Sequence, residues 1–173
     1  AVVFHLIRNA HMNVDELDAL FNKRSGMMGM TGFGDLREVH RLVAEGNEDA
    51  KLALDVYVHR IVGYIGNYTA QMGGVDVITF TAGVGENDDV VRKMVCDKLA
   101  PFGVKLDEEK NATRSKEPRI ISTPDSKITI CVIPTNEELA IARKSAAIAE
   151  AGEDTYGNVF SLSLIHISEP TRH

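Results

Sequence analysis

The longest helical pattern in the sequence runs from residue 47 to residue 72. Apolar side chains return every three to five positions along it, at Leu52, Val56, Ile61, Ile65 and Tyr68. This spacing gathers them on one face of a helix. An asparagine at position 47 is suited to cap the start, and the glycine pair at 73–74 is suited to end it. The pattern therefore predicts a long amphipathic helix over 47–72.

Shorter patterns precede this helix. The first residues, AVVFHLI, place apolar side chains at helical spacing, and residues 14–21 form a similar face after Asn13, a suitable cap. Ser25-Gly26 ends the second pattern. Four glycines then fall within residues 26–34. They predict an irregular segment that bends tightly or approaches a ligand, with a plain surface connection as the alternative.

The second half of the chain alternates strands and helices. Residues 75–82 (VDVITFTA) are rich in β-branched and aromatic side chains and predict a strand covered on both faces. A glycine turn at 83–88 leads into a helix over 90–99, which Pro101 and Gly103 end. This order of strand, glycine turn and helix is typical of α/β proteins.

Two more strands are predicted at 119–122 and 127–133, joined by a turn at 124–125. From the second strand the chain enters a helix that runs to about residue 151, where Thr135 and Glu138 have the spacing of a capping box. The segment 107–111 (DEEKN) is interpreted as a solvated turn. Together these elements predict an α/β fold.

The predicted domain covers residues 1–161. Residues 162–172 (LSLIHISEPTR) follow neither a helical nor a strand period, and they resemble the translation of a transposon-derived sequencing adapter. We therefore interpret 162–173 as a non-native tail, with a natural disordered tail as the alternative. Because the chain starts at Ala1 within an amphipathic pattern, we expect it to be a fragment of a longer protein.

The composition fits a soluble domain and narrows the class of function. The chain has 173 residues, 44% apolar and 25% charged, with a formal net charge of -6. This net negative charge argues against nucleic-acid binding. No stretch of the sequence approaches the ~20 apolar residues of a membrane span. Cys96 and Cys131 lie in apolar runs without the spacing of a zinc site. We expect free thiols and a cytoplasmic protein.

Residues 83–87 (GVGEN) lie between a predicted strand and a predicted helix. Glycines let a ligand approach the backbone, and N–H groups at a helix start face an anion there. The string is neither a Walker A motif nor the dinucleotide fingerprint, and a turn without a ligand would have a similar sequence. From the residues alone, a nucleotide site and a plain turn both stay open.

Glu137 and Glu138 follow the last predicted strand at the start of a helix. Carboxylates beyond the carboxyl end of a strand are well placed to hold Mg²⁺. Acidic residues are also common there because the helix dipole stabilises them, so both interpretations stay open. His59, on the long helix, is assigned no catalytic role, because a lone histidine in such a helix more often packs or faces solvent.

Five ordered strings together resemble the acetate kinase family. The most specific is VITFTAGVGEN at 77–87, a hydrophobic strand followed by F-T-A-G and G-E-N. The others are FNKRSGMMG at 21–29, DLR at 35–37, AKLALD at 50–55 and IPTNEELAIA at 133–142. The resemblance covers about residues 1–155. The family belongs to the sugar kinase, actin and heat-shock ATPase superfamily.

The resemblance implies a fold, a reaction and site residues. The fold is an actin-like (ribonuclease H-like) ATPase domain, here the C-terminal one, with a mixed sheet and flanking helices. The reaction is Mg²⁺-dependent phosphoryl transfer from ATP to acetate, giving ADP and acetyl phosphate, in a homodimer. The implied contacts are Gly83, Val84, Gly85, Glu86 and Asn87 with the nucleotide, Asp35, Leu36 and Arg37 beside the adenosine, and Glu137 with the metal.

In this family the residues around acetate and the transferring phosphoryl group belong to the N-terminal domain. No catalytic residue is therefore expected in this chain, and the chain alone is expected to be an incompetent kinase. A propionate or butyrate kinase stays open, because the acyl pocket lies in the other domain. A non-catalytic actin-like nucleotide-binding module and a purely structural subunit would keep the same fold. Only the structural subunit predicts no nucleotide binding.

Overall fold

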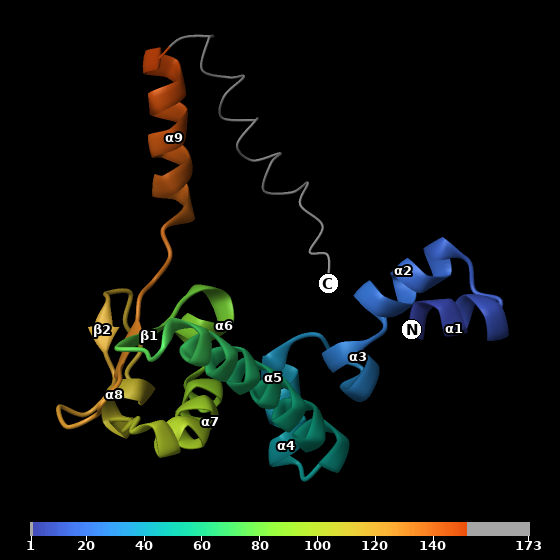
Figure 1. The fold of residues 1–173 in the computed structure, drawn as a ribbon, viewed down its shortest axis with the longest axis horizontal. Coiled ribbons are helices and arrows are strands. Elements are labelled where there is room, and N and C mark those ends of the chain that lie inside the picture. The colour runs from blue at the N-terminus through green and yellow to red at the C-terminus, as the bar shows by residue number, and fades with distance from the viewer. Residues whose placement is uncertain (1, 152–173) are drawn as a thin grey trace. The chain divides into compact units, whose positions relative to one another are not determined.

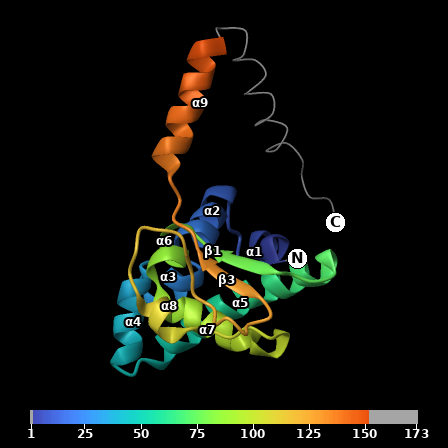
Figure 2. The same ribbon diagram turned by 90° about the vertical axis from the view of Figure 1, so that its left-hand side faces the viewer.

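The computed structural model describes residues 2–151 of the chain (Figures 1 and 2). They belong to two units, Ala1–Ile133 and Pro134–His173, each considered by itself. The single domain predicted over 1–161 stays a prediction, and the tail predicted at 162–173 lies outside the described residues. The elements of the first unit are α1 (Val2–Asn9), α2 (Val14–Lys23), α3 (Gly26–Thr31), α4 (Leu36–Ala44), α5 (Glu48–Met72), β1 (Val77–Phe80), α6 (Ala82–Asn87), α7 (Asp89–Leu99), a 3₁₀ turn (Ala100–Phe102), α8 (Glu108–Ala112), β2 (Arg119–Ile120) and β3 (Thr129–Val132). The second unit contains α9 (Glu137–Ala151).

Several helices begin where the sequence supplies a capping side chain. At the start of α2, Asn13 and Glu16 form a full capping box, in which each side chain accepts a hydrogen bond from the other's backbone N–H. The Oδ1 atom of Asn47 accepts from the N–H of Ala50 at the start of α5. Gly73 ends α5 in the left-handed conformation, with φ +74°. The predicted second helix and the predicted long helix are confirmed.

The three strands form one mixed sheet in the order β1-β3-β2. β1 runs parallel to β3, with Val77 opposite Thr129 and Phe80 opposite Val132, and β2 pairs antiparallel with β3. Figure 2 shows β1 and β3 side by side, with α5 and α7 alongside. Each strand is shorter than its predicted run. The predicted α/β fold, a mixed sheet with flanking helices, is confirmed.

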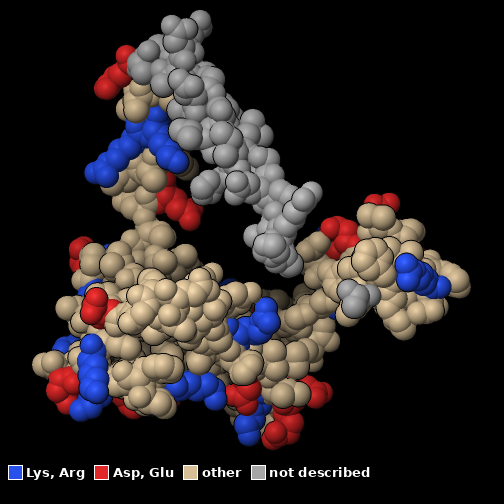
Figure 3. Space-filling model, in the orientation of Figure 1, with Lys and Arg blue, Asp and Glu red and all other residues tan. Residues whose placement is uncertain are grey.

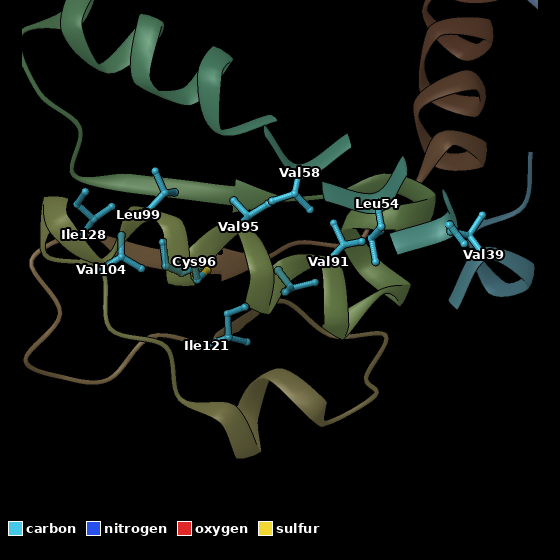
Figure 4. Packing of buried hydrophobic residues seen from close by; sticks show 13 residues of the cluster. Val39, Leu54, Val58, Val91, Val95, Cys96, Leu99, Val104, Ile121 and Ile128 are labelled. Carbon is cyan, nitrogen blue, oxygen red and sulfur yellow. The ribbon is translucent and has the colours of Figure 1, made fainter. Parts of the chain in front are cut away.

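The core of the first unit lies between α5, α7 and the sheet (Figure 4). Val58 from α5, Val95 from α7 and Ile130 from β3 are each 0% exposed. Such close packing resists displacement of any one element. It therefore fixes α7, and with it the segment before α7, relative to the sheet.

The structure corrects the prediction that the first strand is covered on both faces. Val77 and Thr79 are exposed, whereas Ile78 and Phe80 are half-buried and pack against the core. Side chains alternate across a strand, so packing on one side buries only every second residue. In the described part of the chain, helices cover one face of β1.

The large apolar residues that predicted α5 are divided between the core and the surface, and Ile61 and Ile65 pack against the core. Leu52, Val56 and Tyr68 are 54%, 44% and 55% exposed, whereas the fully buried residues include Ala50 and Ala53. The helices α3 and α4 both contact α5, and small buried side chains allow such neighbours to approach closely. Apolar residues thus occupy two faces of α5, one packed against the core and one exposed.

The outer side of α5 presents an uncharged surface. Residues 61–75 contain no Lys, Arg, Asp or Glu, and Tyr64, Tyr68 and Met72 are 52%, 55% and 65% exposed. Figure 3 shows a broad uncharged area over the C-terminal half of α5 and β1. Exposed apolar side chains such as these three, gathered where charges are absent, are typical of protein contacts. No helix within residues 2–151, α5 included, combines the length and apolar character needed to cross a bilayer.

The glycine-rich segment predicted to be irregular contains the helix α3. Its glycines lie where a helix needs them: Gly26 begins α3 at φ +60°, and Gly32 follows it at φ +77°. A side chain at Gly29 would place its Cβ 2.7 Å from the carbonyl oxygen of Arg24. The glycines therefore mark the ends and the packing of a short helix.

The segment 107–111, predicted to be a solvated turn, is also largely helical. Asp107 caps α8 by accepting a hydrogen bond from the N–H of Lys110. Asn111 is 3% exposed and forms hydrogen bonds with α7. The prediction failed because the residues around this buried side chain are polar.

In the second unit, α9 confirms the helix predicted to run to about residue 151. Its capping side chain is Asn136, whose Oδ1 atom accepts a hydrogen bond from the N–H of Leu139 at 2.9 Å. The cap is therefore one residue later than the Thr135 of the predicted capping box.

Candidate functional site

The first unit contains an open pocket of about 1030 Å³ between the start of α4 and the helix α6. Two predicted segments, far apart in sequence, meet there. The predicted site residues that line the pocket are Asp35, Leu36, Arg37, Gly83, Val84 and Asn87. The other two, Gly85 and Glu86, lie in the same helix and turn their carbonyl oxygens toward α7.

The start of α4 forms one wall of the pocket. Asp35 caps this helix by accepting a hydrogen bond from the N–H of Arg37, and its carboxylate also pairs with the guanidinium of Arg37 at 2.6 Å. This side-chain hydrogen bond, followed by the backbone one, lowers the pKa of Asp35 to about 2. Arg37 itself is largely exposed. Its charge is accessible to a ligand in the pocket.

The titration of Asp35 tests this geometry. Its folded-state pKa of about 2 lies below the ordinary 3.8, so its contribution to stability is present above that ordinary value and lost as the pH falls toward 2. Replacing Arg37 with Leu removes the side-chain hydrogen bond that lowers the pKa of Asp35 most. We therefore expect this pKa to rise toward 3.8. Carboxyl ¹³C NMR titration measures it.

Asp125 provides an internal control for that titration. Its pKa is also lowered to about 2, there by hydrogen bonds from Lys105 and Thr123. Arg37→Leu should leave the titration of Asp125 unchanged. An unchanged Asp35 titration in the same variant would contradict the assigned pairing.

A second link joins the two walls of the pocket. The Nε2 atom of His40 in α4 lies 2.7 Å from Oδ2 of Asp88, which directly follows α6. Asp88 also caps α7 through Oδ1, which accepts from the N–H of Val91. Burial, followed by the charge of Asp88, raises the pKa of Tyr57, another residue of the pocket lining.

The sequence prediction missed His40, Asp88 and Tyr57. The sequence contained a signal for two of them. His40 lies four residues after Leu36 and therefore on the same helix face. Asp88 has the residue type and the position of a cap for the helix after GVGEN. Tyr57 comes from α5, a distant segment, and its contribution depends on how the helices pack.

The GVGEN segment is a short helix rather than the predicted glycine turn. A Cβ added at Gly83 would meet no protein atom within 4 Å, although Gly83 lines the pocket. A Cβ at Gly85 would lie 3.2 Å from the carbonyl carbon of Phe80, in β1. The two glycines therefore have different roles: Gly85 allows α6 to pack on the strand, whereas Gly83 leaves the pocket open.

The predicted metal ligand, Glu137, is the first residue of α9 and is exposed. It belongs to the second unit, whereas the pocket belongs to the first. Mg²⁺ typically takes one or two protein carboxylates, with phosphates and waters as its other ligands, so a single exposed carboxylate fits this ion. Within the described residues no group of three or more His, Cys, Asp or Glu side chains is arranged to hold a metal.

An α/β unit with a mixed sheet and a pocket at the end of a strand is common to many nucleotide-dependent enzymes. The family model described as "Acetokinase family" matches residues 1–143. The chain therefore belongs to the acetokinase family. This finding confirms the resemblance on which the sequence prediction rested.

The relatives agree in sequence and in structure. The acetate kinase of Leifsonia xyli subsp. xyli is 52% identical over 152 residues, which are 88% of this chain and 38% of the relative. The crystal structure of Porphyromonas gingivalis acetate kinase matches with a TM-score of 0.78 at 40% identity, covering 86% of this chain and 37% of that one. A propionate kinase from Francisella tularensis matches with a TM-score of 0.74 at 37% identity, covering 82% and 36%. The chain thus spans less than two fifths of the length of these relatives.

Proposed function

We propose that this chain forms the nucleotide-binding part of an acetate kinase, an enzyme that phosphorylates acetate with ATP to give acetyl phosphate and ADP. The observation that carries the proposal is the meeting of residues 35–37 and 83–87 at one pocket. Both segments were assigned to the nucleotide from sequence, and a pocket that both line has room for a ligand of that size.

In this proposal each wall of the pocket has its own task. Asp35, Leu36 and Arg37 flank the adenosine, and the backbone of 83–87 contacts the rest of the nucleotide. Phosphoryl transfer depends mainly on positioning and on neutralising charge. Mg²⁺, held by Glu137, would supply charge neutralisation at the phosphates.

Acetate is favoured as the acyl substrate by the relatives. The Leifsonia protein, at 52% identity, is an acetate kinase. Among the solved structures, the Porphyromonas acetate kinase and the Francisella propionate kinase match at 40% and 37% identity. A propionate or butyrate kinase is the second candidate, because a propionate kinase shares this fold. Turnover of the full-length parent on acetate, compared with propionate and butyrate, decides between them.

The proposed enzyme is a cytoplasmic homodimer. The uncharged outer side of α5, with Tyr64, Tyr68 and Met72 exposed, is the surface that best suits contact with a second copy. Sedimentation of the chain at micromolar concentration should show a dimer. A monomer at every concentration tested would count against this surface.

Calorimetric titration with ADP tests the nucleotide and metal assignments together. We expect the chain to bind ADP more tightly with Mg²⁺ than without it, and the Glu137→Ala variant to lose that Mg²⁺ dependence while still binding ADP. Glu138→Ala is the matched control, because it removes a neighbouring carboxylate from the same helical turn. Equal Mg²⁺ dependence in the wild type and the Glu137→Ala variant would contradict the metal assignment.

A further inference from the structure

The helix α6 requires support from outside itself. It has only six residues, too few for a helix to be stable alone. It begins at Ala82 with φ +57°, a conformation that a residue with a side chain rarely adopts. The carbonyl groups at its C-terminal end also need partners from beyond the helix. The shape of this pocket wall therefore depends on neighbouring residues.

The buried Arg92 of α7 provides that support. Its Nη1 atom donates hydrogen bonds to the carbonyl oxygens of Gly85 at 3.0 Å and Glu86 at 2.9 Å. Its Nε and Nη2 atoms donate to Oδ1 and the carbonyl oxygen of Asn111, at 2.8 and 2.7 Å. Nδ2 of Asn111 in turn donates to the carbonyl oxygen of Asp89. One guanidinium thus connects α6, α7 and α8.

The placement of this charge costs free energy. Arg92 is 2% exposed, and its acceptors are all neutral carbonyl and amide oxygens. Burial, followed by the nearby positive charge of Arg119, lowers the pKa of Arg92. The nearby charges of Asp89 and Asp88 oppose this shift in part. Burying a cation whose hydrogen bonds all go to neutral groups is still unfavourable compared with an apolar side chain of similar size. The reason for an arginine at this position is therefore its set of hydrogen bonds to α6 and α8.

We propose that Arg92, oriented by Asn111, is a positioning residue for the nucleotide site: it holds the backbone of Gly85 and Glu86 so that Gly83 and Val84 line the pocket. This inference rests on the proposed function. It assigns a role at the site to two residues that do not belong to the predicted nucleotide-binding segments. Neither residue touches the nucleotide, and both act through the backbone of α6.

The test compares three variants of the chain with two measurements. Arg92→Met removes the guanidinium and keeps an apolar stem of similar length. Val95→Ala is the matched control, because Val95 lies in the same helix and is 0% exposed. Its replacement with alanine destabilises the core without removing a hydrogen bond to α6. Asn111→Asp retains an acceptor for Nε of Arg92 and serves as the conservative variant. The measurements are amide hydrogen exchange at residues 86–88 without ligand and the Kd for ADP.

We expect Arg92→Met to speed exchange at residues 86–88 by about tenfold or more relative to Val95→Ala, and to raise the Kd for ADP by about tenfold or more. Asn111→Asp should stay within about threefold of the wild type in Kd. Should Arg92→Met fail to fold, Asn111→Leu, which removes the acceptor for Nε and leaves the charge, should give the same two changes.

Exchange at 86–88 that is no faster in Arg92→Met than in Val95→Ala would overturn the positioning role, whether or not ADP binds. Faster exchange with an unchanged Kd for ADP would also overturn it. A wild-type chain that binds no ADP would instead overturn the proposed function, while the exchange measurement would still decide whether Arg92 holds α6.

Discussion

Replacing Gly83 with Ala is expected to weaken ADP binding by about tenfold or more, which corresponds to about 1.4 kcal/mol, without destabilising the fold. An added Cβ meets no protein atom within 4 Å at this position, and Gly83 has no positive φ. Alanine is favoured over glycine in a helix by roughly 0.5–1 kcal/mol, so the melting temperature should stay the same or rise. The lost affinity would then come from the methyl group occupying space that the nucleotide needs.

Gly85→Ala is the matched control for this prediction. Its Cβ would lie 3.2 Å from the carbonyl carbon of Phe80, so α6 must shift against β1 or the variant loses stability. Calorimetry and thermal unfolding of both variants separate the two roles. If Gly83→Ala binds ADP as the wild type does, the nucleotide does not approach α6 closely, and the assignment of 83–87 is wrong.

The second large effect concerns catalysis. We expect the chain alone, given ATP, Mg²⁺ and acetate, to form no acetyl phosphate above background, because the resemblance to the family implies that the acetate-site residues belong to the N-terminal domain. Transplanting residues 1–143 into the corresponding part of the 52%-identical acetate kinase should restore turnover to within about tenfold of that parent. Hydroxamate detection of acetyl phosphate measures both.

A Gly83→Ala variant of the chimera is the control for this experiment. The same chimera with Gly83→Ala should fold, as judged by circular dichroism, and show a raised KM for ATP with little change in the KM for acetate. A folded but inactive chimera would contradict the view that this chain is interchangeable with the nucleotide part of an acetate kinase. Clear turnover by the chain alone would contradict the expected division of the site.

Local signals in the sequence predicted most of the elements correctly. The caps Asn13 and Asn47, and the glycine that ends α5, act within a few residues of themselves, so their effect can be inferred from neighbours in the chain. The strand before GVGEN was also predicted from a local signal, the run of β-branched and aromatic residues at 75–82. What spacing could not decide was which of two apolar faces of α5 meets the core, since that depends on the helices that pack against it.

The site was predictable to the extent that its residues lie in short ordered strings. Residues 35–37 and 83–87 were assigned to the nucleotide in this way, and the structure brings members of both segments to one pocket. Arg92 and Asn111 were not found, because their contact joins positions 19 residues apart through a buried network. A charged residue in an amphipathic helix usually faces solvent, so the sequence offered no sign that Arg92 is buried.

The location of bound ADP tests the central claim most directly. We expect ¹⁵N chemical-shift mapping of the chain with Mg²⁺ and ADP to show the largest changes at the amides of Arg37, Gly83, Val84 and Asn87, which come from both walls of the pocket. Titration should follow a single-site curve. Changes confined to other parts of the chain, such as α1 and α2, or no changes at saturating ADP, would contradict the claim that this pocket binds the nucleotide.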